Sequence, residues 1–217
     1  MKLPEFKDSK LFEKVFIHRS YLNEGGKNME SNERIEFLGD SILSFIVSSY
    51  VYENYPEYDE GKLTSLRSVL TNTETLALVS GQLGLGEKLK LSKGEESNGG
   101  RKNKTILANT YEAVLGGIFL DQGLEDAADF VKKTIIDNMD DFVKEQGLKD
   151  PKSKLQERLQ EIYKNSPVYK IESEEGPDHE RFYTVGVYIE DKLLAKGKGK
   201  SKQIAEKVAA KEALSSV

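Results

Sequence analysis

The sequence of 217 residues contains no cysteine. This absence excludes disulfides, thiolate-bound zinc and a cysteine nucleophile. Long hydrophobic runs are also lacking: none reaches the roughly 20 residues of a membrane-spanning helix, and the charged first ten residues lack the apolar core of a secretion signal. Hydrophobic residues make up only 37% of the chain, although apolar runs such as Ile42–Val47 exclude a disordered polymer. These features predict a soluble, cytoplasmic protein with no membrane partner.

An overall positive charge is lacking as well, because the net charge is -5. Taken over the whole chain, this negative charge disfavours a nucleic-acid partner, but the charges are unevenly distributed. Residues 151–217 hold 13 Lys and Arg against 11 Asp and Glu, whereas residues 1–150 hold 19 against 26. Within residues 192–211, seven lysines accompany a single acid, Glu206. Salt confines the influence of a charge to about 10 Å, so local density matters more than the total. The end of the chain is therefore a candidate basic surface.

Hydrophobic spacing predicts two domains, residues 1–145 and 153–217, joined by a linker at residues 146–152 that is rich in Gly, Pro and charge. The first domain has apolar residues three and four positions apart, which predicts an all-α fold. A polar, glycine-rich stretch at residues 93–104 predicts a loop. The expected helices of this domain are 32–55, 63–83, 105–120 and 124–143.

The second domain changes to an alternating pattern, which predicts strands between two helices. This α-β-β-β-α order within fewer than 70 residues predicts a small α+β domain. The expected elements are a helix at 153–164, strands at 168–173, 182–189 and 193–198, and a helix at 201–215.

Three acids are predicted to share one face of the first long helix. At about 100° per residue, Glu33, Glu36 and Asp40 fall within roughly 60° of one another. The alternative is a solvated acidic face, since like charges on one stripe repel. Gly39 within the same helix costs about 1 kcal/mol relative to Ala, so it indicates that another group approaches the backbone there.

A second helix has Glu112 as the only charged residue in its apolar stretch. An ionised carboxylate in such surroundings needs an ion pair, hydrogen bonds or a metal ion, and Arg34 or Arg67 would supply an ordinary salt bridge. Asn109, one turn earlier, adds an oxygen ligand on the same face. Oxygen-only sites suit hard cations, Mg²⁺ above all. Since Mg²⁺ activates water and neutralises charge on a phosphodiester, the acids and the basic surface together predict phosphodiester hydrolysis.

The segment NERIEFLGD at residues 32–40 resembles the signature motif of the ribonuclease III family. HRSY at residues 18–21 and ILANTYEAVLGGIFLD at residues 106–121 are similar to two further family elements. The resemblance implies an all-α endonuclease domain that forms a homodimer, with one catalytic centre per subunit. It also implies Mg²⁺-dependent cleavage of double-stranded RNA, with Mn²⁺ as a substitute. It further implies a role in the processing of rRNA and mRNA precursors. The expected products have 5′-phosphates, 3′-hydroxyls and short 3′ overhangs.

The same resemblance implies the roles of individual residues. The metal-binding positions are Glu36, Asp40, Asn109 and Glu112, with Asp40 and Glu112 catalytic, and the dimer contacts are Glu33 and Phe37. One match fails, because the family has aspartate at position 109. An amide offers one neutral oxygen and cannot accept a proton from water, which implies impaired activity. Two origins of Asn109 remain open: a natural variant, or a substitution designed to trap an RNA complex.

The second domain resembles the double-stranded-RNA-binding domain in its element order, in EGPDH at residues 175–179 and in KSKQIAEKVAAKEAL from residue 200. Such a binder needs two minor-groove probes with a phosphate clamp between them. The resemblance implies that Gln156 and His179 are the probes, and that the clamp consists of Lys200, Ser201 and Lys202.

Three further possibilities remain open. Arg101 in the expected glycine-rich loop is a predicted mobile phosphate contact, with a simple solvated loop as the alternative. The rival function is a non-catalytic double-stranded-RNA-binding protein on a nuclease scaffold, which Asn109 favours and the other acids disfavour. A structural ribosome component is a third hypothesis, against which the retained acids argue.

Overall fold

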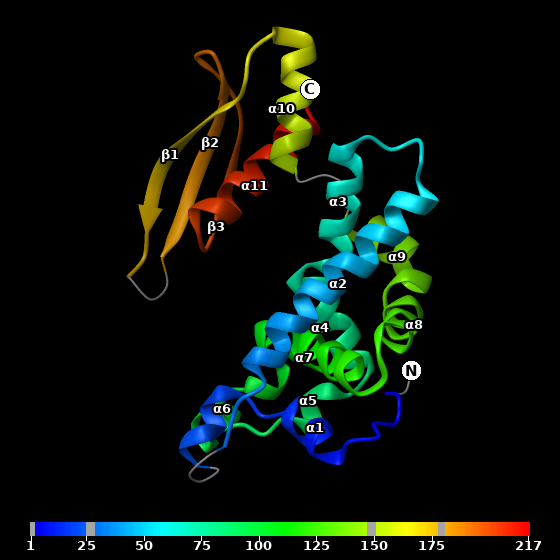
Figure 1. Ribbon diagram of the computed structural model, residues 1–217. Coiled ribbons are helices and arrows are strands. Elements are labelled where there is room, and N and C mark those ends of the chain that lie inside the picture. The colour runs from blue at the N-terminus through cyan, green and yellow to red at the C-terminus, as the bar shows by residue number, and fades with distance from the viewer. Residues whose placement is uncertain (1–2, 25–28, 147–150, 178–180) are drawn as a thin grey trace. The chain divides into compact units, whose positions relative to one another are not determined.

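The computed structural model describes residues 3–24, 29–146, 151–177 and 181–217, with no side chains described at residues 145 and 146. The chain forms two compact units, Met1–Leu148 and Lys149–Val217. The division falls within the stretch expected to be a linker. Figure 1 shows the helices of the first unit and the three-stranded sheet of the second.

The first unit is helical, as the sequence predicts. Its described residues also contain an isolated bridge between Ile17 and Lys90. The elements are α1 (Ser9–Lys14), η1 (Arg19–Asn23), α2 (Glu33–Asn54), α3 (Glu60–Thr71), α4 (Thr73–Gln82), α5 (Leu85–Lys88), α6 (Lys93–Ser97), η2 (Gly100–Lys102), α7 (Lys104–Gln122), α8 (Leu124–Thr134), η3 (Ile136–Asn138) and α9 (Met139–Gln146).

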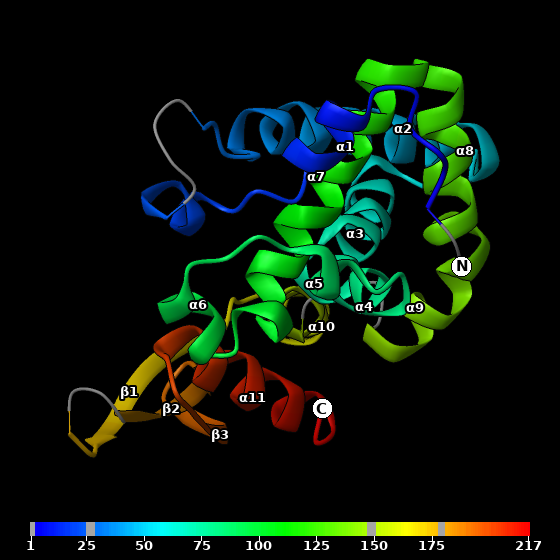
Figure 2. The ribbon, with the colours of Figure 1, turned by 90° about the horizontal axis from the view of Figure 1, so that it is seen from below.

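Helix α7 is the central element of this unit, and it packs against α2, α4 and α8 (Figure 2). Its small and apolar residues between Ile106 and Ile118 are buried almost throughout. Tyr111 is fully buried, and its hydroxyl lies 2.7 Å from Thr134 Oγ1. Burial on all sides accounts for the scarcity of charge that singles out α7 in the sequence.

Two glycines allow α2 and α7 to touch backbone to backbone. An ideal Cβ on Gly39 would overlap the carbonyl oxygen of Glu112 and would lie 3.0 Å from the nitrogen of Gly116. A Cβ on Gly116 would in turn overlap the carbonyl oxygen of Ile35 and lie 3.1 Å from the nitrogen of Gly39. The prediction of a close approach at Gly39 is confirmed, and the approaching group is the α7 backbone.

Two of the predicted long helices are broken, so their predicted extents were wrong. The expected helix 63–83 stops at Asn72, whose extended backbone interrupts it and whose side-chain oxygen accepts from Thr75 N at 2.9 Å to start α4. The expected helix 124–143 is divided by η3 after the buried Ile135. Apolar spacing continues across both breaks, which is why periodicity alone did not reveal them.

The predicted loop at residues 93–104 was also wrong. It contains the short helix α6 and the turn η2. Ser92 caps α6 by accepting from Glu95 N at 3.2 Å, and Gly99 takes a positive φ of 80° before η2. Glycine and polar residues here terminate and cap short helices rather than forming an irregular loop.

Helix α2 is long and apolar enough to cross a membrane by length and composition, alone among the helices of the described residues. The expectation that no segment reaches that length was therefore wrong for α2. Its apolar side chains Ile35, Leu43, Val47 and Val51 are buried in the hydrophobic core of the first unit. Core packing accounts for their number.

The second unit has the predicted order of elements: α10 (Pro151–Tyr163), β1 (Val168–Glu175), β2 (Phe182–Ile189), β3 (Lys192–Gly199) and α11 (Lys202–Leu214). The strands form an antiparallel sheet in the order β1-β2-β3. Leu155 and Leu159 of α10 form one core with Val187 of β2 and Ala209 of α11. Alternate residues of β2 thus face this core, which is the reason for the alternation in the sequence.

A methyl group at Gly39 is expected to force α2 away from α7. We predict that Gly39→Ala lowers the free energy of unfolding by about 3 kcal/mol or more, as overpacking against rigid backbone does. Thermal denaturation followed by circular dichroism measures the change. The matched control is Gly81→Ala in α4, where a Cβ meets nothing within 4 Å; it should stay within about 1 kcal/mol of wild type. Equal stability of the two variants would refute the close packing.

Candidate functional site

The predicted metal-binding residues come from two helices that the glycine contact holds together. Glu36 and Asp40 lie one turn apart on α2, and Asn109 and Glu112 lie one turn apart on α7. The Asn109 side chain is hydrogen-bonded to the Glu36 carboxylate. Asp40 and Glu36 both act electrostatically on Glu112. The structure therefore brings the four residues into one cluster.

The cluster concentrates negative charge in a partly buried position. Burial, together with the nearby carboxylates of Asp40 and Glu36, raises the pKa of Glu112 from its ordinary value to about 7. Burial also raises the pKa of Glu36, with a further contribution from Glu33, while the hydrogen bond with Asn109 acts in the opposite direction. Every cause given for Glu112 raises its pKa, so this carboxylate lacks the compensation that a buried charge requires.

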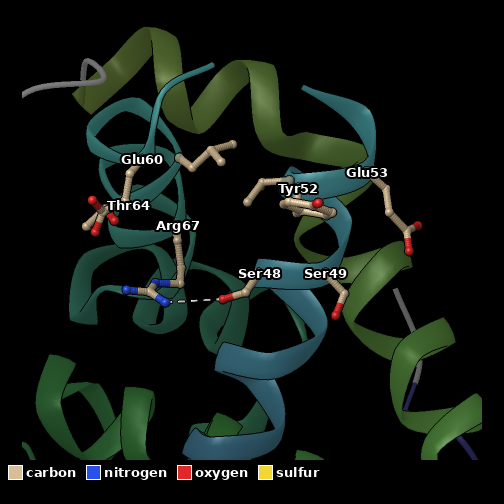
Figure 3. Close-up of a pocket in the computed structure, with 9 residues that line it drawn as sticks. Ser48, Ser49, Tyr52, Glu53, Glu60, Thr64 and Arg67 are labelled. Carbon is tan, nitrogen blue, oxygen red and sulfur yellow. Dashed lines mark hydrogen bonds between the residues drawn. The ribbon is translucent and has the colours of Figure 1, made fainter. Parts of the chain in front are cut away.

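Neither Arg34 nor Arg67, the two arginines considered as partners, forms a salt bridge with Glu112. Arg67 points toward α2 from α3, and its Nη1 donates to Ser48 Oγ at 3.2 Å (Figure 3). The charge of Arg34 acts on Glu30 instead. Within the described parts of the chain, no hydrogen bond or ion pair to the Glu112 carboxylate is present. The ordinary salt bridge is thus not the explanation of Glu112.

The donor set fits a hard cation in chemistry, because carboxylate and amide oxygens are the ligands that Mg²⁺ prefers. Among the described residues, no three or more Asp, Glu or His side chains already converge on one point in the manner of a metal site. The four donors are therefore neighbours whose side chains would have to turn inward to share an ion. The negative charge of these neighbouring carboxylates would attract such a cation.

A polar hollow of about 490 Å³ opens beside the cluster. Glu36 and Asn109 form part of its wall, together with residues that the sequence reasoning did not select, such as Arg19, Asn103 and Thr105. Arg19 Nη1 lies 3.7 Å from Glu33 Oε1. The hollow has the polarity to receive a solvated, charged ligand next to the acids.

The HRSY segment supports the wall of this hollow. His18 Nδ1 accepts from Ser20 N at 3.3 Å and lies 2.9 Å from Ser20 Oγ. Ser20 Oγ in turn accepts from Ser92 N at 3.0 Å, which ties η1 to the start of α6. Burial lowers the pKa of His18. The segment has a structural role, in which a neutral imidazole serves as a cap.

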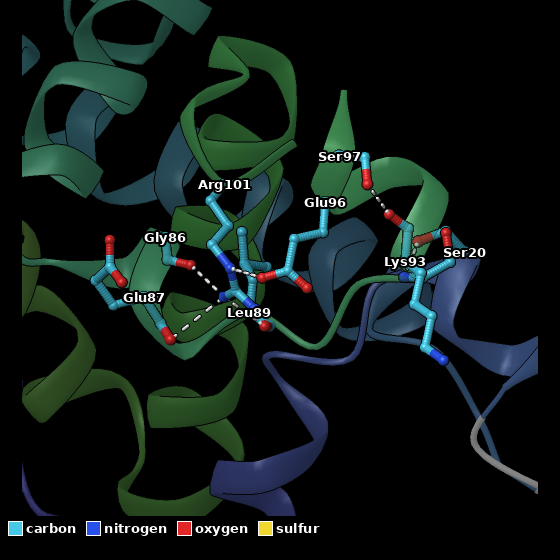
Figure 4. Close-up of polar contacts among 9 residues, drawn as sticks. Ser20, Gly86, Glu87, Leu89, Lys93, Glu96, Ser97 and Arg101 are labelled. Atoms are coloured by element: carbon cyan, nitrogen blue, oxygen red, sulfur yellow. Dashed lines mark hydrogen bonds and ion pairs between the residues drawn. The ribbon is translucent and has the colours of Figure 1, made fainter. Parts of the chain in front are cut away.

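Arg101 is engaged inside the first unit (Figure 4). Its Nη1 donates to the carbonyl oxygens of Gly86 at 2.9 Å and Leu89 at 2.8 Å, and its Nε donates to Glu96 Oε1 at 2.7 Å. The guanidinium therefore satisfies carbonyls at the end of α5. These bonds give Arg101 a structural role within the first unit. The expectation that it also contacts phosphate stays a prediction.

The two predicted dimer residues lie on α2 with part of their side chains in solvent. Phe37 is 77% exposed, and Phe45 and Tyr52 on the same helix are 58% and 74% exposed. At about 100° per residue these three rings fall within about 80° of one another. A hollow of about 410 Å³ between α2 and α3 adjoins Tyr52 (Figure 3). Aromatic rings gathered in this way mark a candidate interface.

In the second unit, the predicted clamp lies at the start of α11. Ser201 caps the helix, its Oγ accepting from Ile204 N at 3.2 Å, and Lys200 is exposed beside it. Lys202 Nζ lies 3.6 Å from Glu174 Oε1. Gln156 is exposed on α10. His179 lies outside the residues that the structure describes.

Residues 8–139 match the family model described as Ribonuclease-III-like, and residues 151–217 match the double-stranded RNA binding motif. The chain is 43% identical over 212 residues to Ribonuclease 3 of Lactococcus lactis subsp. cremoris, covering 96% of this chain and 90% of the relative. It is 41% identical over 216 residues to Ribonuclease 3 of Borreliella afzelii, with 97% and 86% covered.

A solved nuclease domain of ribonuclease III from Campylobacter jejuni also matches, with a TM-score of 0.57 and 36% identity over 62% of this chain and 88% of that chain. The helical unit with its acidic cluster, followed by a domain of the RNA-binding type, defines an endoribonuclease. The chain belongs to the ribonuclease III family. The resemblance stated from the sequence motifs is confirmed.

The raised pKa of Glu112 makes the stability of the metal-free protein depend on pH. Because the folded-state value of about 7 exceeds the ordinary 4.5, ionisation of Glu112 removes stability as pH rises through that interval. We predict that Glu112→Gln, in EDTA, is more stable than wild type at pH 8 by about 1–2 kcal/mol after solvent screening. The difference should vanish near pH 4.5.

Chemical denaturation at the two pH values measures this difference. The control is Glu57→Gln, which neutralises an exposed acid between α2 and α3. Its effect should be the same at both pH values. A Glu112→Gln variant that is no more stable at pH 8 than at pH 4.5, each relative to wild type, would contradict the assignment.

Proposed function

We propose that this chain is a Mg²⁺-dependent endonuclease for double-stranded RNA, with a homodimer as its active form. The observation that carries the proposal is the acidic cluster where α2 meets α7, with Glu112 lacking a favourable partner, in a chain whose second unit matches an RNA-binding motif. Precursors of rRNA and mRNA in the cytoplasm are the proposed substrates.

Glu36, Asp40, Asn109 and Glu112 would hold the cation, and Mn²⁺ would serve as a substitute. When bound, Mg²⁺ supplies activation of water and neutralisation of charge on the attacking and leaving oxygens. Asp40 and Glu112 are the proposed catalytic residues, as the family resemblance implies. In-line attack by water would leave a 5′-phosphate and a 3′-hydroxyl, and two centres cutting opposite strands would leave short 3′ overhangs.

Asn109 weakens this arrangement in two ways. Its amide donates to Glu36, which leaves a single neutral oxygen as a ligand. It also adds no negative charge to a cluster in which Glu36, Asp40 and Glu112 supply all of it. We propose that activity is impaired for this reason.

RNA binding is assigned to the second unit. Lys200, Ser201 and Lys202 at the start of α11 would hold phosphates, where free backbone N–H groups favour an anion. Gln156 on α10, and His179, would reach into successive minor grooves. The affinity contributed by this surface should fall steeply with salt.

A second subunit is proposed to cover the α2 face that carries Phe37, Phe45 and Tyr52. Burying these rings removes apolar surface from water, and the hollow between α2 and α3 has room for an aromatic ring from the partner. Glu33, at the start of the same helix, would lie at the edge of this interface.

Restoring aspartate at position 109 is expected to increase cleavage. We predict that Asn109→Asp cuts a labelled RNA duplex in Mg²⁺ at least about tenfold faster than the present chain, because the added carboxylate strengthens cation binding. The matched control is Asn103→Asp, the same change at the cap of α7 in the same hollow. It should leave the rate nearly unchanged.

The outcomes of this cleavage assay separate the candidate functions. If both the present chain and Asn109→Asp cut equally, the amide suffices and the proposed impairment is wrong. If neither cuts in Mg²⁺ or Mn²⁺ while both bind duplex, the non-catalytic binding protein replaces the nuclease. Asn109 is the observation that favours that second candidate.

The dimer proposal has its own test. We predict that Phe37→Asp raises the dissociation constant of the dimer at least about tenfold, because a charge replaces a ring that the dimer would bury. Sedimentation equilibrium measures the shift. Leu124→Asp is the matched control, since Leu124 is an apolar residue of another helix, 44% exposed at the start of α8. Loss of the dimer in both variants, or in neither, would contradict the assigned face.

A further inference from the structure

One corner of the sheet in the second unit gathers charged groups from β1, β3, α11 and the residue that precedes β2. The end of β1 pairs with the start of β2, so that Glu174 lies opposite Tyr183 and Glu175 opposite Phe182. The start of β2 also pairs with the end of β3, next to which α11 begins. The corner is therefore continuous with the proposed phosphate clamp.

Two cations converge on the carboxylate of Glu174. Lys202 Nζ lies 3.6 Å from its Oε1, and Arg181 Nη1 lies 3.5 Å from its Oε2. A neighbouring pair joins Lys198 Nζ to Glu175 Oε2 at 2.8 Å. Lys202, which is proposed for the phosphate clamp, is thus already paired with a carboxylate of the protein itself.

Aromatic rings lie under the lysines of this corner. Lys202 Nζ is 5.5 Å from the centroid of the Tyr183 ring, and Lys198 Nζ is 5.7 Å from that of Phe182. Such contacts attract the ammonium groups toward the ring faces. They would keep both lysines at the corner when their carboxylate partners leave.

We propose that Arg181 and Lys202 form a phosphate subsite for duplex RNA, and that Glu174 is the resident anion that RNA phosphate displaces. The inference rests on the proposed function and deepens its RNA-binding part. Carboxylate and phosphate are both oxyanions, and arginine and lysine bind either one. Arg181 thereby becomes an RNA contact that the sequence motifs do not assign.

The burial of these groups supports displacement rather than a permanent bridge. The side chains of Arg181 and Glu174 are each 39% exposed, and that of Lys202 is 54% exposed. Exposed ion pairs contribute little stability. A duplex, whose dense charge brings several phosphates to the domain at once, can therefore compete with Glu174. An isolated phosphate, which engages only this subsite, competes poorly.

The consequence is a lower affinity for RNA than the cations alone would give. Removing the resident charge should strengthen binding. For the full chain without divalent metal, and with a duplex of about 16 base pairs, Glu174→Gln should bind about two- to fivefold more tightly than wild type. The slope of log affinity against log salt should become steeper by about one.

The matched control is Glu190→Gln, which makes the same charge change in the turn between β2 and β3 at the opposite end of the sheet. It should alter affinity less than Glu174→Gln does. Arg181→Gln should weaken binding and reduce the salt slope by about one. In the Arg181→Gln background, Glu174→Gln should have a smaller effect than in wild type, since the two residues share one contact.

Fluorescence anisotropy of a labelled duplex, titrated at several salt concentrations, gives all of these quantities. If wild type binds duplex but Glu174→Gln binds no more tightly, or more weakly, the resident-anion role is overturned while the proposed function stands. If Arg181→Gln leaves affinity and slope unchanged, the subsite is overturned. If wild type binds no duplex, the proposed RNA binding and this inference fail together.

Discussion

The approach of α2 to α7 is the constraint on which the rest of the first unit depends. Gly39 and Gly116 leave room for backbone against backbone, where a single methyl group would overlap a carbonyl oxygen. This contact fixes the distance between the two helices and the rotation of each about its axis. Because Glu112 itself supplies the carbonyl that Gly39 accommodates, the packing contact and the acidic cluster are one feature. The glycines lower helix propensity, and the cost is offset by the burial of α7 among α2, α4 and α8.

The same packing also creates electrostatic repulsion within the acidic cluster. Bringing Glu36, Asp40 and Glu112 together in a partly buried site raises the pKa of Glu112 and of Glu36. A folded protein tolerates such repulsion where an ion or substrate relieves it, and perturbed carboxylates therefore cluster at functional sites. The contrast with Arg101 is instructive. Its charge is used inside the protein, on the carbonyls of Gly86 and Leu89, so a basic residue in a polar stretch does not by itself identify a ligand contact.

The second unit shows the opposite arrangement, in which charges balance at the surface. Lys202 and Arg181 share Glu174, and Lys198 pairs with Glu175. These pairs moderate the basic density that the sequence displays between residues 192 and 211. The number of lysines in this stretch therefore overstates the positive charge at the start of α11. The acids of β1, which lie elsewhere in the sequence, pair with these lysines. A domain organised in this way binds through many weak contacts that a polyanion can collect together.

The sequence by itself determined the helical character of the first unit, the α-β-β-β-α order of the second and the identity of the acids, because helix and strand periods and motif spacing are local properties. It also indicated the close approach at Gly39, since a glycine inside a helix has an energetic cost. It did not reveal the breaks at Asn72 and Ile135, where apolar spacing continues while the backbone turns. Only the tertiary structure decided which helix meets Gly39, that Arg101 is engaged internally, and that Glu174 faces Lys202. These contacts join residues far apart in the chain, and their pairing depends on packing that no local pattern records.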